Sequence, residues 1–186
     1  MSYRIATRYA KSVMELAQEK GKLDEVHNDM LMMNSAIKSS TELRVFLKSP
    51  IVNADKKMAV LNKVFAGKIN EITNKFMILL TQKGREGFLH EIAESFVVQY
   101  NQFKNITPVK ITSAVKLDKQ TIDTMLSDLK KRENLGEIQL TETIDESLLG
   151  GFVLLYGDNQ IDSSVRTSLQ KLRNLVDDDS YIKKIR

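Results

Sequence analysis

Residues 150–172 read GGFVLLYGDNQIDSSVRTSLQKL, and this stretch decides the fold of the C-terminal part of the chain. Two adjacent glycines precede an apolar run, and we expect them where a side chain would block a close backbone approach. Gly157-Asp158-Asn159 then supplies residues typical of a hairpin turn. Ser163 or Ser164 is placed to cap the amphipathic segment that follows. The stretch therefore predicts a β-hairpin that leads directly into a helix.

Residues 105–149 add further elements in front of this hairpin. Apolar and polar residues alternate over 105–118 and again over 136–145, which is the period of a β-strand. Between them Asp118 is placed to cap a helix whose apolar positions are Ile122, Met125, Leu126 and Leu129. The resulting order, β-α-β-β-α, predicts a small sheet covered on one face.

Residues 1–105 show helical periodicity instead. The first helix carries Ile5, Tyr9, Val13 and Leu16 on one stripe. A capping-box spacing from Ser39 to Glu42 is expected to open the third helix. The fifth is expected from about Ile69 to Lys83, and it is apolar on more than one face. Six short helices joined by brief turns predict a compact helical bundle.

The fold class is therefore expected to be mainly α, with two domains. The first is an N-terminal six-helix bundle over residues 1–105, and the second is a C-terminal α/β domain over residues 106–186. The lengths of both parts suit small domains.

Composition excludes several classes of protein. The sequence has 186 residues and no cysteine, so disulfides, thiolate metal sites and a cysteine nucleophile are ruled out. Arg4, Arg8 and Lys11 interrupt the first apolar residues, which is unlike a signal peptide. The longest apolar runs, such as 76–80, are far shorter than the roughly 20 residues of a membrane span. We therefore expect a soluble protein.

Charge is distributed unevenly along the chain. Residues 1–105 hold 16 Lys and Arg against 11 Asp and Glu, whereas residues 106–186 hold 12 against 13. A basic first half leaves open a nucleic-acid-binding helical module. Such a module needs clustered basic side chains with exposed aromatics, and here the charges are scattered, so a solvated surface is the favoured interpretation.

Motifs for catalysis or metal binding are incomplete. Gly150 and Gly151 precede their strand and no lysine follows, so a phosphate-binding loop is not formed. A nucleophile elbow is absent, which leaves a small hydrolase or transferase without a nucleophile and base. In HEIAE (90–94) Glu94 stands where a zinc-binding helix has its second histidine. The acidic run 177–179 is interpreted as a solvated helix end, and no cofactor or metal is expected.

Three segments carry a resemblance to a known family. RYAKSVMELA (8–17) and FLKSPIV (46–52) resemble segments of its helical part, and LTETIDESLLGGFVLLYGDNQIDSSVRTSLQKL (140–172) resembles its C-terminal signature. The family is that of the bacterial F-type ATP synthase delta subunits, counterparts of the mitochondrial oligomycin-sensitivity-conferring protein. Two departures are Leu155, where the family often has a polar residue, and Ser163, where it often has glycine.

The resemblance implies a function without catalysis. Delta subunits are stator subunits of the peripheral stalk: they link the alpha/beta hexamer to the b subunits, so that rotation is coupled to ATP synthesis and proton transport. The resemblance also implies a monomer within the complex, peripheral at the cytoplasmic face of the bacterial inner membrane, with no nucleic acid, cofactor or metal.

The resemblance further implies two partner surfaces. The C-terminal domain would engage the C-terminal region of the b subunits. A groove between the first and fifth helices would hold the N-terminal helix of an alpha subunit. The positions that match this groove, or that neighbour it at helical spacing, are Tyr9, Ser12, Val13, Ile72, Phe76, Leu79 and Leu80.

Overall fold

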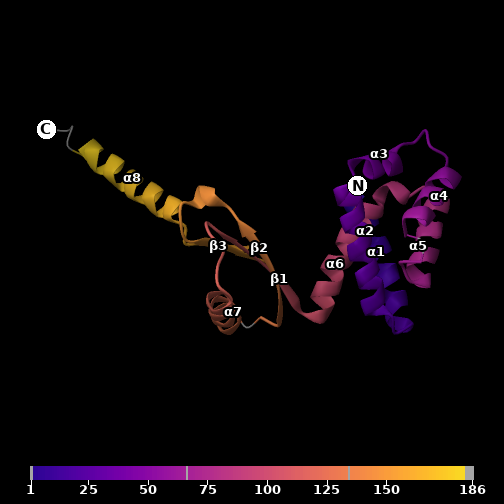
Figure 1. Ribbon diagram of the computed structural model, residues 1–186, viewed down its shortest axis with the longest axis horizontal. Coiled ribbons are helices and arrows are strands. Elements are labelled where there is room, and N and C mark those ends of the chain that lie inside the picture. Colours follow the sequence, from indigo (N-terminus) through magenta and orange to yellow (C-terminus); the bar gives the residue numbers. More distant parts are fainter. Residues whose placement is uncertain (1, 66, 134, 183–186) are drawn as a thin grey trace. The chain divides into compact units, whose positions relative to one another are not determined.

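The computed structural model describes residues 2–65, 67–133 and 135–182, with side chains described as far as residue 175 (Figure 1). Contacts divide the chain into two units, Met1–Phe103 and Lys104–Arg186. Each unit is described by itself below. Within the described ranges, no helix combines the length and the apolar character that crossing a membrane requires.

The first unit is helical throughout, as predicted. Its helices form one compact group in Figure 1. They are α1 (Ser2–Glu19), α2 (Leu23–Ser39), α3 (Thr41–Lys48), α4 (Ala54–Phe65), α5 (Glu71–Gln82) and α6 (Leu89–Lys104), with the short 3-10 helix η1 (Glu86–Phe88) before α6. The prediction of six helices over this part of the chain is confirmed.

The core of this unit is built around α2. Val26, Met30, Met33 and Ile37 recur at helical spacing along it, and all are almost fully buried. The other helices also bury large side chains, of which the largest are Leu61, Phe65, Met77, Leu80, Leu89, Ile92 and Phe96. Each such side chain contributes about 1.5–3 kcal/mol of apolar burial relative to full exposure.

Helix α1 turns a different face to the core from the one predicted. Its buried residues are Ala6, Ala10, Val13 and Ala17, whereas Leu16 is 42% exposed. Alanine side chains let the backbone of α1 approach its neighbours closely, so the small residues take the core side. The larger residues of the predicted stripe, Tyr9 and Leu16, are left at the edge of the core.

The helix caps correct one prediction. Ser40, not Ser39, caps α3, because its Oγ accepts a hydrogen bond from the Leu43 amide at 3.2 Å. Ser39 is still the last residue of α2 and donates its hydroxyl to the Ala36 carbonyl at 3.0 Å. Helix α2 therefore ends one residue later than the capping-box spacing implied.

The second unit has the predicted order of elements. It contains β1 (Ile106–Ser113), α7 (Lys119–Glu133), β2 (Glu137–Ile144), β3 (Phe152–Tyr156), β4 (Asn159–Asp162) and α8 (Val165–Ile182), with a short 3-10 helix, η2 (Glu146–Leu148), before β3. The strand order is β2-β1-β3-β4. β1 and β2 are parallel because α7 crosses between them, and the other pairs are antiparallel.

One face of this sheet meets α7. Val109, Ile111, Leu154 and Tyr156 are buried on that face together with Ile122 and Leu129 of the helix. Leu155 lies between two of these positions and is 37% exposed, as the alternation of strand side chains requires. The first turn of α7 is capped as predicted, since the Thr121 amide donates to Asp118 Oδ2 at 3.3 Å.

The two glycines bring the start of α8 against the start of β3. Gly151 has φ +74°, and a Cβ on it would lie 2.2 Å from the Ser163 carbonyl oxygen. The Val165 amide donates to the Gly150 carbonyl at 3.0 Å. The expected close backbone approach is confirmed, and Ser164 is the cap, because its Oγ accepts from the Thr167 amide at 3.2 Å.

We expect Gly151→Ala to lower the free energy of unfolding by at least about 2 kcal/mol, because strain from the left-handed backbone adds to a clash with fixed backbone. Gly157→Ala is the matched control: its φ is +54° but a Cβ there meets nothing within 4 Å. It should lose only about 1–2 kcal/mol. Urea unfolding measures both, with amide exchange in β3 locating the effect. Equal losses of unfolding free energy in the two variants would contradict a clash at Gly151.

Candidate functional site

The candidate site is a groove between α1 and α5 in the first unit. Its volume is about 740 Å³. It is lined by Tyr9, Ser12, Val13, Leu16, Lys20, Lys22, Asn70, Glu71, Ile72, Lys75, Phe76 and Leu79. Most of the uncharged lining residues are apolar, so the groove offers a surface that a nonpolar partner can cover.

The structure brings six of the seven predicted contact residues together in this groove: Tyr9, Ser12, Val13, Ile72, Phe76 and Leu79. Leu80 does not line it. Successive helix residues point about 100° apart, and where Leu79 is 45% exposed, Leu80 is fully buried in the bundle interior. Leu80 thus supports α5 from the core side and offers no surface to a partner.

The floor of the groove comes from both helices. Phe76 of α5 is 8% exposed, and its ring lies 6.4 Å from that of Tyr9, with the planes tilted by 57°. Aromatic pairs at such distances and tilts attract each other beyond their buried area. Val13 is buried beside them. This packing gives the groove a preformed apolar base.

Five lining residues beyond the predicted set make one end of the groove polar, and Leu16 extends its apolar part. Leu16 and Lys75 lie one helical turn after predicted residues. Helical spacing alone was therefore enough to find them. Lys20, Lys22, Asn70 and Glu71 lie where α1 ends and α5 begins. Local periodicity does not extend across helix ends, and only the folded chain brings these residues together.

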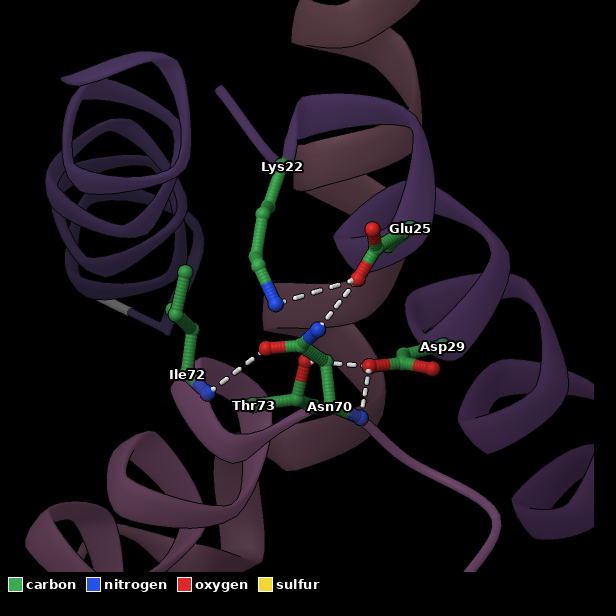
Figure 2. Close-up of polar contacts among 6 residues, drawn as sticks. All are labelled: Lys22, Glu25, Asp29, Asn70, Ile72 and Thr73. Carbon is green, nitrogen blue, oxygen red and sulfur yellow. Dashed lines mark hydrogen bonds and ion pairs between the residues drawn. The ribbon is translucent and has the colours of Figure 1, made fainter. Parts of the chain in front are cut away.

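A buried carboxylate holds the start of α5 at this end (Figure 2). Asp29 of α2 is 7% exposed, and its Oδ2 accepts hydrogen bonds from the Asn70 amide at 2.7 Å and from Thr73 Oγ1 at 2.6 Å. Hydrogen bonds to an ionised acceptor are among the stronger ones in proteins. Asp29 therefore fixes the first turn of α5 against α2.

Asn70 connects this anchor to the surface. Its Oδ1 accepts from the Ile72 amide at 3.1 Å, so it caps α5. Its Nδ2 donates to Glu25, whose carboxylate also lies 3.6 Å from Lys22 Nζ (Figure 2). The cap, the carboxylate and the lysine thus form one continuous set of polar contacts at the end of the groove.

The exposed Glu71 is held in its charged form. Lys75 Nζ lies 2.5 Å from its carboxylate, and this hydrogen bond and the lysine charge hold the pKa of Glu71 below its ordinary value, with Lys22 adding to the effect. A lowered pKa keeps a carboxylate ionised at neutral pH. Glu71 therefore presents a negative charge to Lys75 and Lys22 at neutral pH.

The described residues contain no cluster suited to a metal ion, since no three His, Cys, Asp or Glu side chains among them are placed to hold one. His90 lies 3.6 Å from Glu94 on the same helix. The side chains of the acidic run 177–179 lie outside the described residues. What the groove offers is a binding surface of limited width, which suits a helix or an extended segment.

A second candidate surface lies on α8. Val165, Leu169, Leu172 and Leu175 recur at helical spacing and are exposed by 43–65%. An amphipathic helix in a globular protein ordinarily turns such a stripe to a core. Val176 lies one helical turn after Leu172, and its side chain lies outside the described residues. Helix α8 thus presents an apolar face that a partner can cover.

Comparison with known proteins gives a consistent result. The family model described as ATP synthase delta (OSCP) subunit matches residues 5–176. The ATP synthase subunit delta of Christiangramia forsetii is 35% identical over 182 residues, covering 98% of both chains. That of Cytophaga hutchinsonii is 39% identical over 171 residues, covering 92% of this chain and 93% of the relative.

A solved structure shares the fold. A chain in the cryo-EM structure of the Toxoplasma gondii mitochondrial ATP synthase hexamer superimposes with a TM-score of 0.70 at 22% identity. The match covers 92% of this chain and 96% of the other. At this level of identity the likeness bears on the fold alone.

We expect Asp29→Ala to cost about 2–3 kcal/mol in the free energy of unfolding, because it leaves buried donors on Asn70 and Thr73 without their acceptor. Asp29→Asn keeps one acceptor oxygen and should cost less. Asp55→Ala, at an exposed position in the first turn of α4, is the surface control. Urea unfolding compares the three, and equal stability of all of them would show that Asp29 does not anchor α5.

Proposed function

The chain belongs to the ATP synthase delta (OSCP) family, and we propose on this premise that it is a non-catalytic stator subunit of the F-type ATP synthase. In this role it links the alpha/beta catalytic hexamer to the b-subunit peripheral stalk. The link keeps the hexamer from turning with the rotor, so that rotation is coupled to ATP synthesis and proton transport. It places the protein peripherally, through the complex, at the cytoplasmic face of a bacterial inner membrane.

The observation that carries this proposal is the apolar groove between α1 and α5. In the proposed complex it holds the amphipathic N-terminal helix of one alpha subunit, a helix-in-groove mode of recognition. Leu79 and Ile72 supply apolar area that the partner covers, at roughly 25 cal/mol per Å². Because the Tyr9–Phe76 floor is already packed, binding requires little reordering of the protein.

The second contact in this proposal is with the C-terminal region of the b subunits. The exposed stripe of α8 supports it, since an apolar helix face of this length suits packing against another helix. Two contacts on one chain raise the effective concentration of each partner at the other site. A link of this kind resists torque without either contact being of extreme affinity, and one copy of the chain per complex is enough.

We expect a peptide of about 20 residues from the N-terminus of the alpha subunit to bind one-to-one with a negative heat-capacity change, because apolar surface is buried. Leu79→Asp should weaken binding by about 30-fold or more, since it places a charge among the apolar residues that the partner covers. Val45→Asp, at an exposed apolar position of α3 outside the groove, is the matched control. Isothermal titration calorimetry measures all three.

Each outcome of this titration bears on the proposal. Binding that survives Leu79→Asp unchanged would place the alpha-subunit contact elsewhere on the protein. Absence of binding by the folded wild-type protein would contradict the stator proposal in its present form.

We expect the double variant Leu169→Asp and Leu172→Asp to lose binding to the C-terminal region of the b subunits. The stability of the protein should change little, because both side chains are more than half exposed. Binding of the alpha-subunit peptide should be unaffected, which makes it the internal control. Co-purification with the b-subunit segment tests this, and full retention of that segment would exclude the α8 stripe as the contact.

A further inference from the structure

The charged residues that line the groove all lie at one end of it. Lys20, Lys22 and Glu71 are found where α1 ends and α5 begins, and Lys75 lies one turn further along α5, paired with Glu71. At the opposite end the lining residues are Tyr9, Ser12 and Leu79, which carry no charge. The groove therefore has a direction: one end is apolar and the other is polar.

The polar end carries a net positive charge. Of its three lysines, Lys22 lies 3.6 Å from Glu25 and Lys75 lies 2.5 Å from Glu71. The third carboxylate at this end, Asp29, is buried and held by Asn70 and Thr73. Among the accessible side chains, three lysines therefore face two glutamates, which leaves one positive charge in excess. Ion pairs between exposed side chains contribute little, so Lys22 and Lys75 are able to turn toward a new partner at small cost.

We propose that the groove selects an amphipathic helix with acidic side chains at one end, and that these lie against Lys20, Lys22 and Lys75, so that the helix binds in one direction. This inference rests on the proposed function and adds to it the charge pattern and the direction of the partner helix. Opposite charges across an interface favour the correct register and suppress others.

The dimensions of the groove set where the acidic side chains belong. From Tyr9 to Lys20, α1 rises by about 16 Å, or about three helical turns. A partner helix therefore makes its apolar contacts over about three turns, with its acidic residues at the end of this stretch. Reversing the helix would bury those carboxylates against Tyr9 and Leu79 without partners, which is unfavourable.

The fixed geometry at the polar end strengthens this selection. Glu25 holds both Lys22 and the Asn70 side chain, and Asp29 holds the Asn70 backbone (Figure 2). The start of α5, and with it Glu71 and Lys75, is thus positioned before a partner arrives. The backbone positions of Lys22 and Lys75 are therefore set in advance, and only their side chains turn toward the acidic residues of the partner.

The direction is tested with two amphipathic probe peptides of about 16 residues that share one apolar stripe, long enough for the groove. One has two glutamates in its first turn and the other has them in its last turn, and each carries a nitroxide at its N-terminus. Paramagnetic broadening of amide signals is read in the isotope-labelled full-length protein. The first peptide should broaden Lys20 and Lys22, and the second should broaden Tyr9 and Ser12. Broadening of the same residues by both peptides would overturn the inference.

The charge requirement is tested with a triple variant, Lys20→Gln, Lys22→Gln and Lys75→Gln. The control is Lys38→Gln, Lys56→Gln and Lys63→Gln, which removes the same charge from exposed positions outside the groove. We expect the groove variant to bind either peptide about tenfold more weakly at low salt and to lose the salt dependence of binding. Wild-type affinity and salt dependence in the groove variant would overturn the inference.

These outcomes separate the inference from the proposed function. If Leu79→Asp abolishes peptide binding while the lysine variant binds like wild type, the groove remains the site and its charge selection is wrong. If Leu79→Asp has no effect, the assignment of the groove itself fails. The nitroxide measurement uses the wild-type protein, so it does not depend on how well any variant folds.

Discussion

The hydrogen bonds that Asp29 accepts from the first turn of α5 are the contact on which the first unit's binding surface depends. The carboxylate is buried on α2, the helix at the centre of the core, and it meets both the Asn70 amide and the Thr73 hydroxyl. Burying a charged group is costly unless it is fully hydrogen-bonded. The same arrangement that satisfies the carboxylate therefore fixes α5, and with it one wall of the groove.

The other wall depends on the division of apolar residues on α1. Its alanines lie against the core, and this leaves Tyr9 and Leu16 for the groove. A helix with large residues on its core side would lie further from its neighbours. Its large apolar side chains would then be buried in the core and would not line a groove. In this bundle the small residues provide the packing, and Tyr9 and Leu16 line the groove.

The second unit also leaves an apolar helix face exposed, on α8. The close approach between Gly151 and the Ser163 carbonyl directs the chain into α8 beside the sheet edge. Helix α7 covers one face of the sheet, and the apolar stripe of α8 is exposed. Both units thus combine a closed core with an apolar helical surface that a partner can cover.

The amino-acid sequence by itself determined the order and type of the elements, the hairpin, the Asp118 cap and the need for glycine at 150–151, because these follow from periodicities and turn geometry within a few residues. It also placed Tyr9 and Leu79 near one another through the family resemblance, with Phe76 as a neighbour at helical spacing. Only the tertiary structure decided that α1 turns its alanines inward, that Leu80 belongs to the core, and that Asp29 and the lysines define one end of the groove. Those outcomes depend on which side chains meet across distant segments, and local patterns hold no information about the partner against which a face will pack.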